Sequence, residues 1–400
     1  MTTPIAALAL LALALALLVA FALAVRRKNM AVWLPAYCHA LFRRRRAVVR
    51  PIHVMFCFVD HFEPKWGRVD YPRECARVER WRRRYPELCA RHRDADGRPP
   101  VHSFFYPAEE YRPEHLDPLV ELCRLGLGEI EIHLHHHDDT AEGLRKSLRE
   151  FNELLMAQHD CLARDAATGQ ARWSFIHGNW ALDNARPDGK YCGVNNELIV
   201  LREEGCYADF TLPCAPDPSQ TRTINSIYYA TDDPERPKSH DRGVPVAVGV
   251  PPTGDLMIVQ GPLGLDWKNR KYGLLPRIEN ADVRASMPPT PARVDHWVRT
   301  AIHVAGRPDW CFIKVHTHGT QERDEETLLG EPMHAMHDYL EKQYNDGREF
   351  VLHYVSAREL YNIAKAAEAG MTGNPGNYRD FLVKRPAYAV QSRPGKAQAS

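Results

Sequence analysis

The sequence lacks closely spaced cysteine pairs, a charge excess of either sign and internal repeats beyond an alternation of strand and helix patterns. Its ten cysteines stand at irregular spacing, and no CxxC pair occurs. This pattern favours reduced, mostly buried thiols over a disulfide framework or a cysteine zinc site. The formal net charge of +1 gives no case for nucleic-acid binding by the chain as a whole.

Length and composition are those of a globular protein. Hydrophobic residues make up 44% and charged residues 26% of the 400 residues. That length suits one large barrel-type domain with appendages, or two ordinary domains. Histidine is frequent, with 20 residues, and several stand close together.

The N-terminus carries a long hydrophobic run. Residues 5–25 are apolar throughout, and about 20 such residues cross a bilayer core as a helix. Residues 1–4 have no basic side chain, which favours an uncleaved anchor over a secretory signal. We therefore predict a transmembrane anchor with its basic flank at residues 1–28.

Basic residues follow the anchor at 26–28 and 43–46. The positive-inside rule then places the body on the cytoplasmic side of a bacterial-type inner membrane, with a body outside the membrane as the alternative. Residues 29–50 form a basic juxtamembrane segment, and 30–42 are rich in aromatic and aliphatic side chains. This segment lies in the lipid headgroups or is a plain linker, and the sequence leaves both readings open.

Strand and helix patterns alternate through residues 51–370. The predicted strands are 53–59, 101–105, 129–135, 173–176, 207–212, 311–315 and 350–354. The predicted helices are 70–93, 115–127, 140–162, 195–205, 293–304, 325–344 and 357–369. Such alternation predicts a parallel α/β sheet, closed as a barrel or doubly wound. We expect an insertion at about 213–290 and a loosely ordered tail at 371–400.

Polar residues follow four of these strands, at 60–61, 133–137, 177–179 and 316–318. In a barrel the carboxyl ends of all strands converge on one mouth, so this placement favours the barrel. Residues 129–134 alternate apolar and polar side chains, as a strand does, and lead into the histidine run.

Imidazole nitrogens are good ligands for zinc and related metals. His133 and His137, with Asp60 or His61, could hold a divalent ion, for which zinc is the first choice. Metal-assisted hydrolysis also needs a base for the attacking water and an acid for the leaving group. The remaining carboxylate of the first strand could be the base, and His316 or His318 the acid.

These stretches resemble the motifs of the polysaccharide deacetylase (NodB-homology) family. Residues 58–61 (Phe-Val-Asp-His) are similar to the family's Thr-Phe-Asp-Asp motif, and residues 129–137 to its His-(Ser/Thr)-x-x-His motif. Residues 315–318 are similar to its Leu-x-His motif. The resemblance implies a distorted (β/α)7 barrel that removes acetyl groups from sugars. The family's Arg-x-Pro-x-Gly motif is absent at 177–180, and Asp209 alone matches part of its Asp-x-x-Asp-Trp motif.

Carried over residue by residue, the resemblance makes Asp60 the general base and His61, His133 and His137 the metal ligands. His316 or His318 then takes the place of the catalytic histidine.

The remaining candidates have weaker assignments. His177, Asn179 and Trp180 are expected to bind substrate, whereas His135 and His136 are expected behind the ligands or at the surface. Trp66 and Trp267 could stack on sugar rings or pack in the core.

The sequence thus predicts a metal-dependent hydrolase. It would remove an acetyl or formyl group from an amino sugar or polysaccharide precursor, lipid-linked, at the membrane. The alternative is an inactive barrel that binds glycan or scaffolds a polysaccharide biosynthesis complex.

Overall fold

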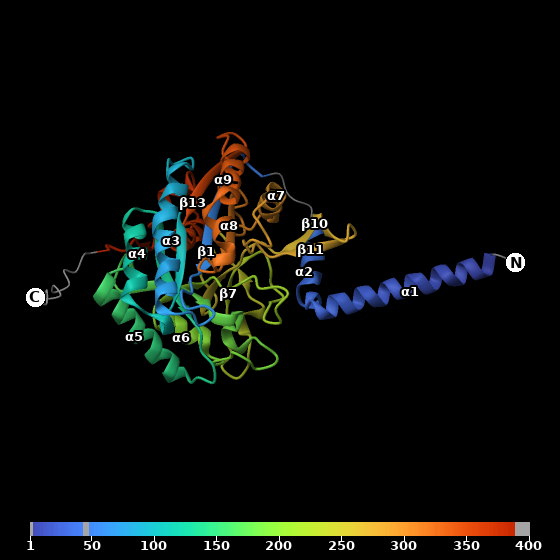
Figure 1. Cartoon of the computed structure of the whole chain (residues 1–400), viewed down its shortest axis with the longest axis horizontal. Coiled ribbons are helices and arrows are strands. Elements are labelled where there is room, and N and C mark those ends of the chain that lie inside the picture. The colour runs from blue at the N-terminus through green and yellow to red at the C-terminus, as the bar shows by residue number, and fades with distance from the viewer. Residues whose placement is uncertain (1–2, 43–47, 389–400) are drawn as a thin grey trace, which may run out of the picture.

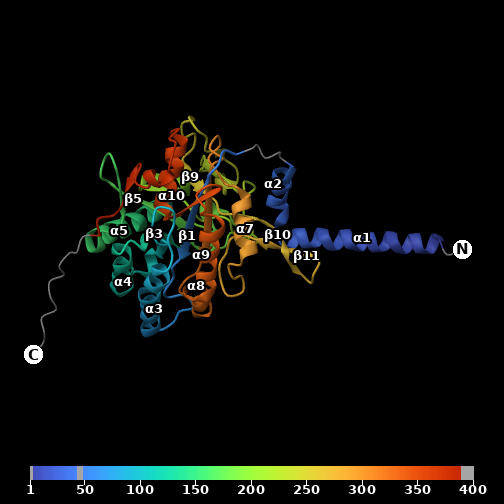
Figure 2. The same cartoon turned by 90° about the horizontal axis from the view of Figure 1, so that it is seen from above.

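The computed structural model describes residues 3–42 and 48–388. The basic run at 43–46 and the end of the expected tail, residues 389–400, lie outside the described residues. Helix α1 (Thr3–Arg27) projects away from an α/β body, and α2 (Met30–Phe42) lies between the two (Figures 1 and 2). The window Leu8–Arg27 is long and apolar enough to cross a membrane, and none of it is buried in the protein.

The body is built on a mostly parallel sheet around β1 (Ile52–His61). On one side β1 pairs with β12 (Trp310–Thr317) along almost its whole length. On the other side its first six residues pair with β13 (Phe350–Val355) and its last four with β2 (His102–Pro107). Because β2 and β12 both run parallel to β1, the carboxyl ends of these three strands lie close together.

Beyond β2 the parallel order continues through four more strands, and an antiparallel ribbon completes the sheet. In order these are β3 (Gly128–Leu134), β5 (Ala171–His177), β6 (Cys206–Asp209) and β9 (Leu256–Val259), then β7 (Ile227–Ala230) and β8 (Val244–Pro245). The short β4 (Ala163–Asp165) pairs with β5 outside this path.

All the helices predicted for the body are present. They are α3 (Tyr71–Ala90), α4 (Pro113–Arg124), α5 (Ala141–His159), α6 (Glu197–Glu203), α7 (Pro291–Thr300), α8 (Glu325–Leu329), α9 (Glu331–Gln343) and α10 (Ala357–Glu368). The helix expected at 325–344 is divided at Gly330, whose backbone is extended. Pro332 explains the division, because it lacks an N–H and begins a new helix more readily than it continues one.

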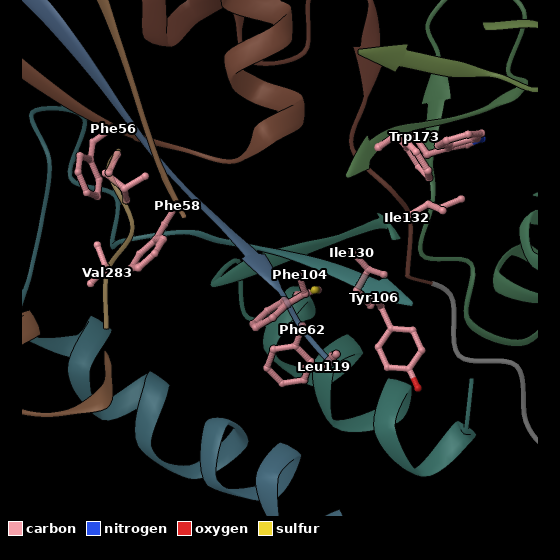
Figure 3. Close-up of a cluster of buried hydrophobic side chains, with 14 of the residues drawn as sticks. Phe56, Phe58, Phe62, Phe104, Tyr106, Leu119, Ile130, Ile132, Trp173 and Val283 are labelled. Carbon is pink, nitrogen blue, oxygen red and sulfur yellow. The ribbon is translucent and has the colours of Figure 1, made fainter. Parts of the chain in front are cut away.

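One face of the sheet packs under the surrounding helices. Phe58, Phe104 and Ile130 lie in this core with Leu119 of α4 (Figure 3). Ile132 continues the row, so the apolar side of β3 faces the helices as its alternation predicts.

The other face of the sheet is filled by α10. Met55, Cys57 and Val59 of β1 share a core with Leu360 and Ile363 of this helix. Residues around the whole circumference of α10 are buried, because its apolar side packs on the sheet and its polar side contacts the segment 371–388.

Within the described residues no hydrogen-bonded ladder joins β12 to β9, so the strands follow an open path. Single contacts nevertheless bring the two regions together. Lys314 of β12 donates to the carbonyl oxygen of Phe210 at 2.5 Å and to that of Leu212. A Cβ on Gly261 would lie 2.3 Å from the Lys314 carbonyl oxygen, so only glycine allows this approach.

The expected insertion at 213–290 supplies β7, β8 and β9 to the sheet, together with a hairpin of β10 (Gly264–Lys271) and β11 (Leu275–Glu279). Helix α2 packs against this region: Trp33 is fully buried with Ala215 and Leu263. Asn29 Nδ2 also donates to the Pro216 carbonyl oxygen at 2.8 Å. Residues 30–42 of the juxtamembrane segment are therefore a helix attached to the insertion.

The described part of the expected tail, residues 371–388, packs on the body. Strand β14 (Val383–Lys384) pairs with β4. Arg379 is buried and donates to the Tyr354 carbonyl oxygen at 2.6 Å and to Asp94 at 3.2 Å. Its composition suggested loose order, but these buried polar contacts tie the segment down.

Glu131 of β3 is a buried carboxyl group whose protonation links the stability of the fold to pH. It is 2% exposed and accepts hydrogen bonds from Tyr207 Oη and Ser174 N, each at 2.5 Å. Burial raises the pKa of this carboxyl to about 8. Between about pH 4.5 and 8 the folded protein therefore retains a proton that the unfolded chain releases, so this group lowers stability as the pH rises.

We expect Glu131→Gln to gain stability relative to the unsubstituted protein as the pH is raised from 5 to 8. The relative gain should be about 1–4 kcal/mol, because one unit of pKa difference corresponds to about 1.4 kcal/mol. Urea unfolding at both pH values measures it. Glu322→Gln is the control, because Arg77 holds the pKa of Glu322 at about 2. Its effect should be equal at both pH values, and a pH-independent effect of Glu131→Gln would contradict the prediction.

Candidate metal centre

Three donor atoms meet where β1 and β3 end. Glu63 Oε1 lies 3.4 Å from His133 Nε2 and 3.0 Å from His135 Nε2. All three ligand atoms lie within 4.8 Å of one another. His133 and His135 are two residues apart at the end of a strand, so their side chains point to the same side. We call Glu63, His133 and His135 the central triad.

Each imidazole of the central triad is held by a second contact. His133 Nδ1 donates to the Ile176 carbonyl oxygen at 2.7 Å, and His135 Nδ1 lies 2.5 Å from Glu109 Oε1. A carbonyl oxygen can only accept, so Nδ1 of His133 carries the proton and Nε2 faces Glu63. Metal-ligating histidines usually have such a partner on the nitrogen that does not bind the metal.

The charge of the central triad is fixed by the same contacts. Burial raises the pKa of the Glu63 carboxyl, but its contacts with His133 and His135 outweigh burial and hold it well below its usual value. Burial lowers the pKa of His135, but Glu109 and Glu63 raise it to about 10. The carboxylate is thus ionised inside the protein.

These residues fit a divalent metal ion. Two imidazoles and one carboxylate are the donor set of many catalytic zinc sites, which leave further positions open for water and substrate. The orienting contacts of both histidines are already in place. Of the four groups of ligand side chains that the described residues bring together, this one lies at the ends of β1 and β3.

The aromatic rings of His61, His318 and Trp180 pack together beside the central triad. The His61 ring is 5.1 Å from that of His133 and stacks on His318, with centroids 4.6 Å apart. The ring centroid of Trp180 lies 6.1 Å from that of His318 and 6.3 Å from that of His61. Burial, reinforced by His318 and His133, holds the pKa of His61 well below its usual value, so this imidazole is neutral.

Asp60 is turned away from these groups. Its Oδ1 accepts from Gly319 N at 2.6 Å, and its Oδ2 lies 2.9 Å from His102 Nε2. Neighbouring strand residues point to opposite faces, so His61 and Asp60 cannot both face the central triad. Asp60 instead fixes the loop that carries His318.

The structure does not bring His137 to the central triad. Its side chain is 51% exposed, and its Nε2 lies 3.2 Å from Asp138 Oδ2. Strand β3 ends at Leu134, so the alternation that aims His133 and His135 at Glu63 does not continue to His137. His135, and not His137, lies with His133 beside Glu63.

The other sequence candidates are distributed around the centre. His316 is 4% exposed, with its ring 6.4 Å from that of His61, and His177 is fully buried beside His136 and Glu197. Asn179 has a left-handed backbone next to Trp180. Asp209 is buried and accepts from the Thr211 hydroxyl at 2.6 Å.

Glu63 and Glu109 are the site residues that sequence reasoning missed. Glu63 stands two residues after His61, so continued alternation could have identified it. Glu109 lies in the short helix Ala108–Glu110 after β2, where the sequence carries no comparable signal.

Neither family models nor curated proteins match the chain.

We expect His133→Ala/His135→Ala to lose one equivalent of bound Zn²⁺ per chain, because it removes both imidazole ligands of the central triad. Metal content after equilibration with Zn²⁺ and desalting measures this. His137→Ala is the matched control from the same histidine run and should retain all its metal. Loss of metal in the control, with retention in the double variant, would favour His137 as the ligand.

Proposed function

We propose that this chain is a metal-dependent hydrolase that removes an acetyl or formyl group from an amino sugar, in a lipid-linked or polymeric carbohydrate precursor. The observation that supports it is the convergence of an ionised carboxylate and two oriented imidazoles beside a neutral imidazole and an indole. A closed (β/α)7 barrel belongs to the same proposal, supported by the approach of Lys314 to the segment after β6.

Glu63, His133 and His135 would hold the metal. A bound divalent ion would polarise the acyl carbonyl and lower the pKa of a water molecule. His61 is the neutral group beside the central triad and would accept a proton from the attacking water. His318 would donate a proton to the leaving nitrogen or oxygen.

Asp60 would act as a positioning residue, because both of its oxygens already have partners. Trp180 would stack on a face of the sugar ring.

The second candidate function is glycan binding or scaffolding without catalysis. It is favoured by the orientation of Asp60, which leaves the centre without the carboxylate base that the resemblance implies. The two functions differ in whether acyl release accompanies glycan binding.

We expect release of acetate or formate from acylated amino-sugar glycolipids, measured on the Zn²⁺-loaded full chain. His318→Ala should lower kcat by about 10²–10⁴-fold, the usual effect of losing a general acid. Asp60→Asn should lower kcat less than His318→Ala does, because it acts through the loop at Gly319. His137→Ala should retain full activity. Glycan binding without any acyl release would instead support the second candidate function.

We also propose that the body lies against the membrane. Helix α1 is long and apolar enough to span a bilayer. The β10–β11 hairpin lies beside α2 and reaches toward the base of α1 in both views (Figures 1 and 2). Its large apolar side chains are exposed: Trp267 53%, Tyr272 81% and Leu274 76%.

The hairpin has the chemistry of a membrane-surface element. Arg270 and Lys271 are exposed beside these apolar side chains, and Lys271 Nζ lies 5.2 Å from the ring centre of Tyr272. Aromatic side chains prefer the headgroup level, and basic ones are attracted to anionic lipid. The flanking residues 26–28 favour a body on the cytoplasmic side.

We expect Trp267 and Tyr272 to be protected from hydroxyl-radical oxidation when the full chain is moved from neutral detergent into nanodiscs with anionic lipid. Trp66 (43% exposed) and Tyr191 (47% exposed) are controls and should be oxidised equally in both. Equal oxidation of the hairpin in both preparations would count against membrane contact. A reporter fused after Ser400 tests the side, and activity outside the membrane would reverse the orientation.

A further inference from the structure

A second group of ligand side chains lies next to the central triad and takes no part in it. His136 follows β3, His177 ends β5 and Glu197 begins α6. Glu197 Oε1 is 3.2 Å from His136 Nε2 and 3.5 Å from His177 Nε2. The three atoms lie within 4.8 Å of one another. We call these residues the lateral triad.

The lateral triad is almost entirely shielded from solvent. Glu197 and His177 are 0% exposed, and the His136 side chain is 7% exposed. Glu197 Oε2 accepts from Asp183 N at 2.6 Å, which leaves Oε1 directed at the two imidazoles. A buried carboxylate is costly unless a cation or several donors compensate it.

One ring nitrogen of the buried His177 lacks a hydrogen-bond partner among the described residues. Its Nδ1 lies 2.5 Å from the Gly178 carbonyl oxygen, so Nδ1 holds the proton. Its Nε2 is buried and has no hydrogen-bond partner among the described residues. A neutral His177 thus directs a bare lone pair at Glu197 Oε1. Two such electron-rich atoms repel each other unless a cation lies between them.

An ion pair alone does not account for this arrangement. A protonated His136 would bridge Asp139 Oδ2, 3.0 Å from its Nδ1, and Glu197, but it would leave His177 Nε2 without a partner. A metal ion satisfies all three donors at once. Asp139 then becomes the carboxylate that orients a ligating histidine, as is common around zinc.

The segment that joins His177 to Glu197 has little regular secondary structure of its own, so a metal ion bound at both ends would stabilise it. Its backbone is left-handed at five non-glycine residues: Asn179, Trp180, Asp183, Asn184 and Tyr191. Only short 3-10 helices occur between β5 and α6. The segment also packs closely, since a Cβ on Gly193 would lie 2.1 Å from His136 Cε1.

We propose that His136, His177 and Glu197 form a second metal site, which takes Zn²⁺ and holds residues 178–196 in place. The ion would join three separate elements of the chain, with water completing its coordination. Its role is structural, because the site is buried. It positions Trp180 beside His61 and His318.

The test measures bound Zn²⁺ on the purified full chain in detergent. The unsubstituted protein should retain two equivalents, and Glu197→Gln and His136→Ala/His177→Ala should each retain one. Glu197→Gln preserves the shape of the side chain and its contact with Asp183 N, so it guards against loss of the fold. His137→Ala is the control and should retain two.

Trypsin provides a readout that is independent of activity. Lys190 lies in the anchored segment, and cleavage after it should become about tenfold faster in Glu197→Gln or after chelation. In His137→Ala the cleavage rate should not change.

A single Zn²⁺ equivalent that disappears in His133→Ala/His135→Ala would overturn the proposal. So would two equivalents that persist in Glu197→Gln and in His136→Ala/His177→Ala. Two equivalents in a protein without acyl-release activity would leave the second site standing and count against the hydrolase alone.

Discussion

The Glu63 carboxylate, buried between His133 and His135, is the interaction on which the arrangement of the site depends. An ionised carboxylate inside a protein needs donors or cations on every side. The end of β3 brings His133 and His135 to Glu63, which follows β1, because the two strands end at the same edge of a parallel sheet. Thr320 adds to the arrangement by donating to the Glu63 carbonyl oxygen at 2.6 Å, which ties the loop after β12 to the same place.

Strand alternation decides which neighbouring side chain enters the site. His61 and Asp60 differ by one position, and this difference sends one to the central triad and the other to the loop at Gly319. Asp60 still influences the centre, because that loop carries His318 into its stack with His61. The adjacent residues Asp60 and His61 therefore lie in different places, with His61 beside the central triad and Asp60 under the loop at Gly319.

The sequence predicted the regular part of the fold well, because buried parallel strands and amphipathic helices carry strong periodic signals. The seven expected strands are present, and candidate ligand side chains lie together at the ends of β1 and β3. The geometry beyond the strand ends could not be predicted in this way. His133 and His137 suggested a ligand pair by their spacing, but that spacing brings side chains together only in a helix. In a strand that gives way to a turn, the partner of His133 is His135.

Contacts between segments that are far apart in the chain could not be predicted from the sequence either. The packing of Trp33 against Leu263 gives α2 its place, and neither residue indicates the other in the sequence. The Arg379 contacts with Tyr354 and Asp94 likewise order a segment whose composition suggests a loose tail. Both depend on burial that arises only when the chain is folded.

The two triads share the end of β3, and this links them mechanically. His135 and His136 are consecutive, yet one points to Glu63 and the other to Glu197. Each packs against its own glycine: a Cβ on Gly178 would lie 2.2 Å from His135 Cδ2, just as Gly193 makes room for His136. Gly178 directly follows His177 and precedes the segment of Trp180. The ring of one triad therefore rests on the backbone that the other triad holds. A displacement of His177 would reach His135 through Gly178 before it reached any bound substrate.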